Sequence, residues 1–262
     1  MPFIELSTVD STNNYALKQV HAGLAQHRMA VFAHEQVAGK GQRGKSWTTE
    51  PGSGIILSVL VDPHPISITR QFTFSASIAV AVCDFFRQYA GDEVRIKWPN
   101  DLYWRDRKAG GILIENVIGK RKTPGTTIHP GSHSGDWLWA VAGIGININQ
   151  VSFPEALKNP VSLRQITGRR FDSVSLAREL CTQLDMRFKQ LAGGDFDNIY
   201  SSYLSNLYKR NERVKLKKGT RVFEALIKSI SSTGQLIVEH GIEESFDFGE
   251  IEWVMEENES KK

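Results

Sequence analysis

The sequence has 262 residues, of which 40% are hydrophobic, 23% charged and 10% aromatic, a composition typical of soluble globular proteins. This length is sufficient for one or two domains with a sizeable core. The formal net charge of +3 is far below the basic excess expected of a protein that coats nucleic acid, so no DNA partner is expected.

Neither a membrane span nor a secretory signal is predicted. No segment approaches the roughly 20 continuous apolar residues of a transmembrane helix. The N-terminus, MPFIELSTVDST, lacks the basic start and the apolar run of a signal peptide. The two cysteines, Cys83 and Cys181, fall in apolar helical patterns, which indicates small core residues in a reducing compartment. We therefore expect a cytoplasmic protein.

The first 208 residues mix strands and helices without regular alternation. Strands are predicted over residues 3–6, 29–33, 54–61, 94–98, 110–116 and 137–148. Helices are predicted over residues 69–89, 174–191 and 196–208, with another starting after the capping residues 10–13. The polar segment 116–136 is predicted to be a hairpin loop. This pattern favours an α+β domain with a mixed sheet over a doubly wound one.

The pattern changes after Tyr208. Four short strands are predicted over residues 214–216, 223–230, 235–239 and 251–255. Turn dipeptides separate the first three strands and follow the third, at residues 218–219, 233–234 and 240–241. Residues 209–262 are therefore expected to form a small all-β domain, ending in a solvated tail at 256–262.

The first stretch with chemical character is residues 39–47, GKGQRGKSW, in which three glycines lie among three cations. Glycines allow backbone N–H groups to approach phosphates, and Lys40, Arg43 and Lys45 supply charge for a carboxylate or phosphate. Trp47 offers a flat face for a base. The spacing fits neither a Walker loop nor the dinucleotide fingerprint. On composition alone, a flexible basic surface loop with a buried Trp is as well supported as a loop that binds a ligand.

Three further stretches carry weaker signals. Residues 97–102, KWPNDL, form a turn after a strand. Residues 108–113, KAGGIL, place a lysine before two glycines that open an apolar strand, although a lone lysine there is usually a solvated charge. Residues 143–149, GIGININ, have glycines at alternate strand positions, which suggests close approach of a ligand or a neighbouring backbone.

Together and in this order, these stretches resemble the biotin–protein ligase family. The resemblance rests on the loop 39–47, Lys-Trp-Pro-Asn-Asp at 97–101, residues 108–113, Asp-Ser-Thr-Asn at 10–13, and Gly-Ile-Gly-Ile-Asn at 143–147. It covers most of residues 1–208 and implies a class II synthetase-like catalytic fold, with an SH3-like barrel at 209–262. The Ser-Thr-Asn that begins at Ser11 leaves no room for the DNA-binding domain of the regulatory branch, so the enzyme-only branch is expected.

The resemblance implies a biotin site and an ATP site. The expected biotin-binding residues are Ser11, Thr12, Asn13, Gln36, Gly39, Lys40, Lys108, Gly111 and Gly143. The expected ATP-binding residues are Lys40, Gln42, Arg43, Trp47, Lys97, Asn100, Asp101 and Asn147. The expected catalytic residues are Lys108, Lys40, Arg43 and Asp101, with Asp101 also an Mg²⁺ ligand.

The implied reaction activates biotin with ATP and Mg²⁺ and transfers it to a lysine of a biotin carboxyl carrier domain. Ser11 and Thr12 are alternatively helix caps. Gln42 departs from the arginine of many members and lacks its charge. The edge of the expected sheet could support a homodimer.

Two other functions remain open on the sequence. A lipoate or octanoate ligase or transferase shares the catalytic fold, although the Trp-terminated loop and the intact Lys-Trp-Pro-Asn-Asp favour biotin. A biotin or nucleotide sensor without turnover is the second, although intact lysines argue against it. The C-terminal β domain is interpreted as an accessory that closes the site or receives the carrier, with a peptide-binding module as the alternative.

Overall fold

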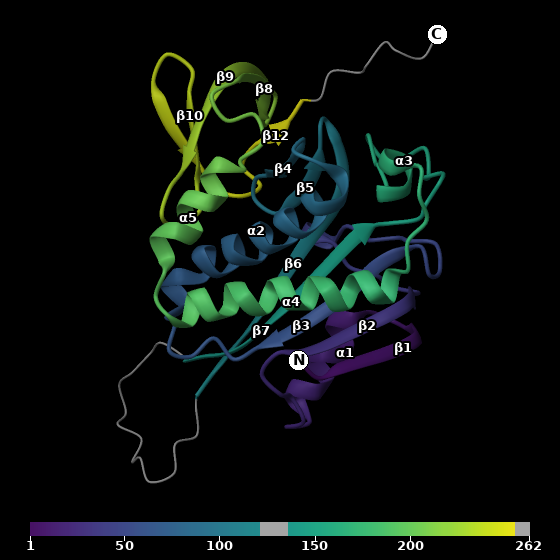
Figure 1. Ribbon diagram of the computed structural model, residues 1–262. Coiled ribbons are helices and arrows are strands. Elements are labelled where there is room, and N and C mark those ends of the chain that lie inside the picture. Colours follow the sequence, from purple (N-terminus) through teal and green to yellow (C-terminus); the bar gives the residue numbers. More distant parts are fainter. Residues whose placement is uncertain (121–135, 255–262) are drawn as a thin grey trace.

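The computed structural model describes residues 1–120 and 136–254, which form two β-sheets with helices around the larger one (Figure 1). The larger sheet has seven strands in the order β1-β2-β3-β7-β6-β5-β4, and the smaller has five in the order β11-β10-β9-β8-β12. All neighbouring pairs are antiparallel except β1 and β2. The predicted α+β class with a small second β unit is confirmed.

The elements have the following bounds. The larger sheet contains β1 (Phe3–Val9), β2 (Met29–Gln36), β3 (Gly54–Val61), β4 (Val94–Lys97), β5 (Asp101–Trp104), β6 (Arg107–Gly119) and β7 (Asp136–Asn147). The smaller contains β8 (Arg213–Lys218), β9 (Arg221–Ile230), β10 (Leu236–Glu239), β11 (Glu243–Phe246) and β12 (Glu252–Trp253). The helices are α1 (Thr12–His21), α2 (Gln71–Ala90), α3 (Leu163–Thr167), α4 (Ser173–Ala192) and α5 (Phe196–Ser205).

The larger sheet is covered on both faces. Leu57 and Val59 of β3 join the main core, to which α2 and α4 also contribute, whereas Leu60 joins a smaller cluster beneath α1. Because both faces of β3 are buried, its sequence is nearly continuously apolar instead of alternating. In Figure 1, α2 and α4 lie in front of the sheet and α1 lies behind it. The two faces therefore carry cores of different size, the larger beneath α2 and α4 and the smaller beneath α1.

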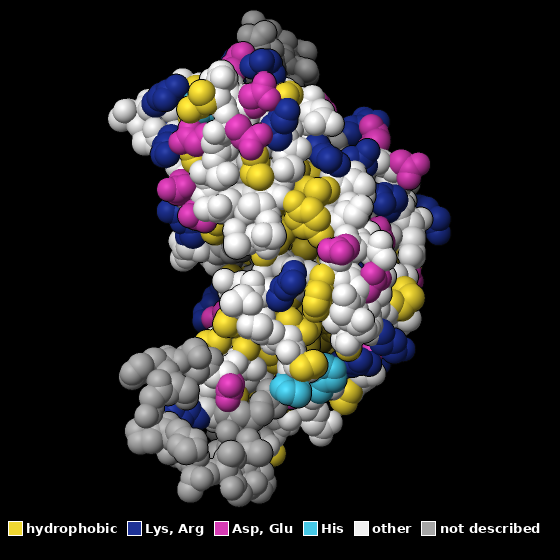
Figure 2. All heavy atoms as spheres, turned by 90° about the vertical axis from the view of Figure 1, so that its left-hand side faces the viewer, with side chains coloured by type: hydrophobic (Ala, Val, Ile, Leu, Met, Phe, Trp, Pro, Cys, Tyr) yellow, Lys and Arg dark blue, Asp and Glu magenta, His cyan; other side chains and the backbone are white. Residues whose placement is uncertain are grey.

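The smaller sheet is packed against the larger part. The indole Nε1 of Trp98 donates to the Gly234 carbonyl at 2.8 Å, and the Tyr200 hydroxyl of α5 donates to the Ile230 carbonyl of β9. Buried residues of both sheets belong to one hydrophobic cluster. Figure 2 shows hydrophobic side chains gathered down the middle of one face of the molecule. The Lys-Trp-Pro-Asn-Asp segment is thus held between the two sheets.

Sequence and structure differ mainly in short elements. Strands β5 and β11 and helix α3 were not predicted, because four or five residues carry too little periodicity to be separated from turns. Strand β1 runs to Val9, three residues beyond its predicted end. Most of the predicted loop 116–136 lies outside the described residues, as does the tail 256–262. Within the described ranges, no helix is both long and apolar enough to cross a membrane.

The shared core predicts that the smaller sheet does not unfold separately. Phe246→Ala removes a fully buried ring from it and should lower the free energy of unfolding by about 3–5 kcal/mol, in a single transition. Phe248→Ala is the matched control, since Phe248 is 48% exposed and should change stability by no more than about 1 kcal/mol. Chemical denaturation followed by tryptophan fluorescence measures both. Two separate transitions in the parent protein would contradict a common core.

Candidate active site

Glycines leave a bare area on the α1 face of the sheet. Gly111 of β6 lies opposite Gly145 of β7, and Gly143 lies opposite Leu113. A Cβ at Gly143 would lie 2.4 Å from Asn13 Oδ1, and a Cβ at Gly145 would lie 2.5 Å from the Trp47 ring. No side chain fits at either position, because the Asn13 amide and the indole already lie against the backbone. Residues predicted from three distant sequence stretches therefore meet here.

A buried polar cluster surrounds the start of α1. Gln36 Oε1 accepts hydrogen bonds from the Thr12 backbone N–H at 2.7 Å and from the Thr12 hydroxyl at 3.0 Å. Ser58 Oγ lies 2.7 Å from Thr12 Oγ1 and 2.6 Å from Asn13 Oδ1. Ser11 occupies the N-cap position of α1, but its side chain makes no capping hydrogen bond, contrary to the capping alternative. The predicted residues Ser11, Thr12, Asn13 and Gln36 are thus brought together.

Hydroxyl protons are scarce in this cluster. Gln36 Oε1, Thr12 Oγ1, Ser58 Oγ and Asn13 Oδ1 form a row with three close O···O contacts. The amide oxygens at both ends only accept, since Asn13 Nδ2 donates to Glu115 Oε2 at 2.7 Å. Two hydroxyl protons therefore serve three contacts. A ligand that brings N–H donors satisfies this row better than one that brings further acceptors.

The glycine-rich loop folds back on itself beside the bare area. The Trp47 N–H donates to the Gly39 carbonyl at 2.9 Å, and the Gly41 N–H donates to the Lys45 carbonyl at 2.7 Å. Between these bonds, Gln42 is half-buried in a short 3₁₀ turn. The loop is thus closed at its base and exposed at Arg43 to Ser46.

Each cation of the loop has a different environment. Lys40 Nζ lies 4.0 Å from a Glu115 carboxylate oxygen. Arg43 has a left-handed backbone (φ 55°), and its guanidinium donates to the Gly249 carbonyl of the C-terminal part at 3.3 Å. Lys45 is exposed. The loop therefore contacts both the sheet face and the smaller β unit.

Trp47 lies near Lys108 as well as against the sheet. Lys108 Nζ lies 5.9 Å from the centre of the Trp47 ring and 2.7 Å from Asp101 Oδ1. The indole Nε1 is buried and has no hydrogen-bond partner among the described residues. The indole therefore packs on the Gly145 backbone and leaves its own N–H unsatisfied.

Lys97 is buried between the two sheets and is only 8% exposed. Its ammonium donates to the Tyr103 hydroxyl at 3.1 Å and lies 5.1 Å from the centre of the Trp253 ring. Burial lowers the pKa of Lys97 to about 8, although the nearby Asp101 carboxylate opposes this shift. Lys97 therefore combines a buried charge with a position close to the Lys108–Asp101 pair.

The two predicted asparagines serve the local framework. Asn100 Nδ2 donates to the Ile112 carbonyl, and the main-chain carbonyl of Asn100 accepts from the Ile112 N–H at 3.1 Å. Asn147 Nδ2 donates to the Val161 carbonyl at 3.2 Å, and Asn147 Oδ1 accepts from Gln150. These bonds tie β5, β6 and β7 to neighbouring segments, so a nucleotide contact by either side chain would compete with them.

Sequence reasoning did not single out four residues that contact the predicted site, namely Ser58, Glu115, Gly249 and Trp253. Ser58 had a readable signal, since it is the one polar side chain in the apolar strand β3. Gly249 and Trp253 come from the smaller sheet, and their proximity depends on how the two parts pack. No sequence spacing could have indicated that contact.

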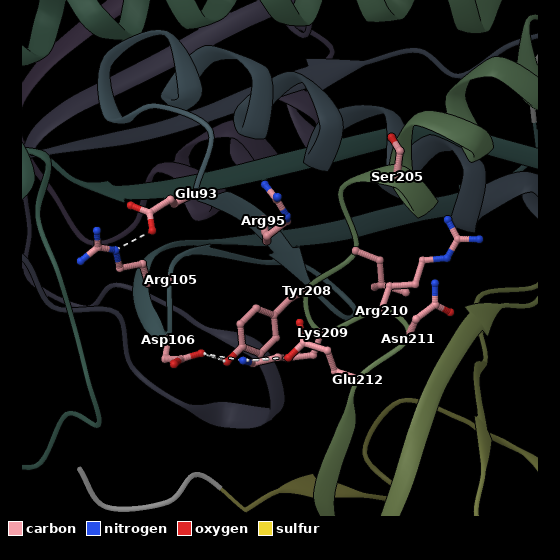
Figure 3. Close-up of a pocket in the computed structure, with 11 residues that line it drawn as sticks. Glu93, Arg95, Arg105, Asp106, Ser205, Tyr208, Lys209, Arg210, Asn211 and Glu212 are labelled. Atoms are coloured by element: carbon pink, nitrogen blue, oxygen red, sulfur yellow. Dashed lines mark hydrogen bonds and ion pairs between the residues drawn. The ribbon is translucent and has the colours of Figure 1, made fainter. Parts of the chain in front are cut away.

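A recess of about 630 Å³ lies elsewhere, where the segment after α5 runs along the edge strand β4 (Figure 3). Its lining is mostly charged, and ion pairs such as Arg105–Glu93 at 2.7 Å occupy it. It contains none of the predicted site residues. We therefore do not assign the chemistry to this recess.

Comparisons with known proteins agree with the geometry. The Biotin/lipoate A/B protein ligase family model matches residues 6–129. The bifunctional ligase/repressor BirA of Escherichia coli (strain K12) is 31% identical over 255 residues, covering 94% of this chain and 72% of that protein. The biotin–[acetyl-CoA-carboxylase] ligase of Paracoccus denitrificans is 30% identical over 241 residues, covering 89% of this chain and 92% of that protein.

The fold has a close counterpart among solved structures. Biotin protein ligase from Aquifex aeolicus, in complex with biotin and ATP, matches with a TM-score of 0.76 at 22% identity, over 97% of this chain and 99% of that chain. The matched family model and the fold are both those of protein ligases of the biotin/lipoate type. The relatives narrow this class further: the chain belongs to the biotin–protein ligase family and is a biotin ligase.

The low pKa of Lys97 predicts a pH-dependent stability. Between pH 8 and its usual pKa of 10.5, the unfolded protein holds more protons on Lys97 than the folded protein does, so stability rises with pH in this window. Relative to Lys97→Met, the parent should therefore lose on the order of 2 kcal/mol of unfolding free energy between pH 10.5 and pH 7. Urea denaturation of both proteins across this range tests the prediction. A constant difference between them would contradict a buried, desolvated Lys97.

Proposed function

We propose that this enzyme forms biotinyl-5′-AMP from biotin and ATP and transfers the biotin to a lysine of a biotin carboxyl carrier domain. The observation that carries the proposal is the meeting of the acceptor-rich Thr12 cluster, the Trp47 ring and the Lys108–Asp101 pair around one bare area of sheet. The names of the Paracoccus relative and of the ligand-bound Aquifex structure support the two substrates and the acceptor.

The Thr12 cluster fits the ureido end of biotin. Biotin has two ureido N–H groups, which suit a row of oxygens that is short of protons. Lipoate and octanoate have no N–H donor, so the same cluster argues against the rival ligases. In this assignment Ser11, Thr12, Asn13 and Gln36 bind the ureido ring. Gly39, Gly111 and Gly143 are the remaining proposed biotin contacts, and the missing side chain of Gly143 makes room for the Asn13 amide.

In the first half-reaction, a biotin carboxylate oxygen bonds to the α-phosphorus of ATP and pyrophosphate leaves. Two anions must approach each other, so fixed positive charge lowers the barrier. Lys108 stands beside the reacting groups, with Lys40, Arg43 and Lys97 as partners for the phosphates. Trp47 supplies the stacking face for adenine. Gln42, Asn100 and Asn147 are the remaining proposed contacts to the nucleotide.

Mg²⁺ is proposed to enter with the nucleotide. In residues 1–120 and 136–254, no group of three or more His, Cys, Asp or Glu side chains is arranged to hold a metal. Mg²⁺ is commonly bound by substrate phosphates and one or two carboxylates, so a single protein carboxylate is enough for this proposal. Asp101 is the proposed carboxylate, and the ion would neutralise phosphate charge.

In the second half-reaction, the neutral amine of the acceptor lysine attacks the mixed anhydride, AMP leaves, and a proton is lost. A free lysine has a pKa of about 10.4, so a nearby base favours the neutral amine. Asp101 is the proposed base, held in place by Lys108 at 2.7 Å.

Two parts of the chain have separate proposed tasks. Residues 1–208 form the catalytic unit, and residues 209–262 form an accessory that closes the site or receives the carrier. The contact of Arg43 with Gly249 supports this division, since it joins the loop to the smaller β unit. The glycine-rich loop is proposed to order over the adenylate and to shield it from water.

Lys108→Ala should reduce the rate of biotinyl-AMP formation by about 100-fold or more, because a preorganised charge is lost from the reacting centre. Single-turnover formation of the labelled adenylate measures this step, and transfer to a purified biotin carboxyl carrier domain measures the next one. Lys189→Ala, at an exposed position on α4, is the control and should match the parent. Adenylate formation within threefold of the parent would remove Lys108 from its role. Adenylate without carrier labelling would remove the proposed acceptor.

A further inference from the structure

Glu115 of β6 connects two parts of the site that are far apart in sequence. One carboxylate oxygen accepts from Asn13 Nδ2 at 2.7 Å, and the other lies 4.0 Å from Lys40 Nζ. Asn13 belongs to the start of α1, and Lys40 belongs to the glycine-rich loop. The Glu115 side chain is only 30% exposed, so both contacts form at a partly shielded position.

The first contact fixes the orientation of an amide. A carboxylate can only accept, so Asn13 must turn Nδ2 toward Glu115 and Oδ1 toward Ser58. In this orientation Oδ1 lies 2.4 Å from the position that a Cβ of Gly143 would occupy, which glycine leaves empty. The reversed amide would place an oxygen against the carboxylate and an N–H₂ group against Ser58. Glu115 thereby keeps the row through Ser58 and Thr12 rich in acceptors.

The second contact is weaker and acts on the loop. An ion pair at 4.0 Å with 44% exposure on the lysine side chain contributes little free energy by itself. Lys40 is, however, bridged to Ser46 across the base of the loop, next to Trp47. A change at Asn13 and a change at Lys40 can therefore influence each other through one carboxylate.

We propose that Glu115 is a positioning residue that sets the acceptor pattern of the biotin pocket and links it to the glycine-rich loop. Glu115 touches neither reacting atom and acts through Asn13 and Lys40. The inference rests on the proposed function, since it assigns the residue a part in binding the ureido ring.

Three substitutions separate the two contacts. Glu115→Ala removes both and should weaken biotin binding by about 10-fold or more, as expected for losing a charge-assisted hydrogen bond. Glu115→Gln keeps an acceptor for Asn13 and should stay within about threefold of the parent. If the alanine variant does not fold, Glu115→Asn takes its place, since its side chain is one methylene shorter and cannot reach Asn13.

Calorimetric titration with biotin and steady-state kinetics are the measurements. Glu115→Ala should raise the KM for biotin far more than it lowers kcat. The double variant Asn13→Ala/Glu115→Ala should bind biotin no more weakly than the weaker-binding of the two single variants. Biotin should protect the loop lysines from trypsin in the parent but less in Glu115→Ala. Glu93→Ala, which removes an exposed carboxylate bonded to Arg105, is the control and should leave all readouts unchanged.

The outcomes distinguish the inference from the function on which it rests. Biotin affinity of Glu115→Ala within twofold of a parent that binds biotin would overturn the inference alone. Additive effects of the Asn13 and Glu115 substitutions would also overturn it. A parent that does not bind biotin would overturn the proposed function itself.

Discussion

The pairing of β6 with β7 places glycines of both strands on one face of the sheet, and the site is arranged around that bare backbone. Gly111 lies opposite Gly145, and Gly143 lies two residues before Gly145 on the same strand, opposite Leu113. A β-carbon at Gly143 or Gly145 would enter the space of Asn13 or Trp47. The other face of the same strands carries the apolar residues that pack on α2, so the ladder is anchored from behind. A shift of register by one residue would exchange the two faces and remove the site.

The charged side chains of this site differ in how far they are buried. The Lys108–Asp101 pair is close and partly exposed, whereas Lys97 is buried between aromatic rings and its pKa is lowered to about 8. Lys40 and Arg43 lie on a loop whose base is closed by backbone hydrogen bonds. The cations thus lie in separate environments, which limits their mutual repulsion.

Much of this architecture could be predicted from the sequence because its signals are local. The glycine-rich loop, the long helix α2 and the buried strand β3 each carry a pattern that is readable within one segment. The partners of these segments could not be read in the same way. Glu115 looked like an ordinary polar residue of a strand, and its role depends on Asn13, which lies 102 residues away. Likewise, the approach of Gly249 to Arg43 depends on the packing of the two sheets, which no spacing encodes.

ATP–pyrophosphate exchange with purified enzyme and Mg²⁺ tests the proposed adenylation of biotin most directly. It is run separately with biotin, lipoate and octanoate. We predict exchange with biotin alone, because the acceptor-rich Thr12 cluster requires N–H donors that the other two acids lack. Exchange with lipoate or octanoate would contradict the assignment of the pocket. Absence of exchange with all three, by folded protein that still binds biotin, would contradict the adenylation reaction and leave a biotin sensor as the remaining function.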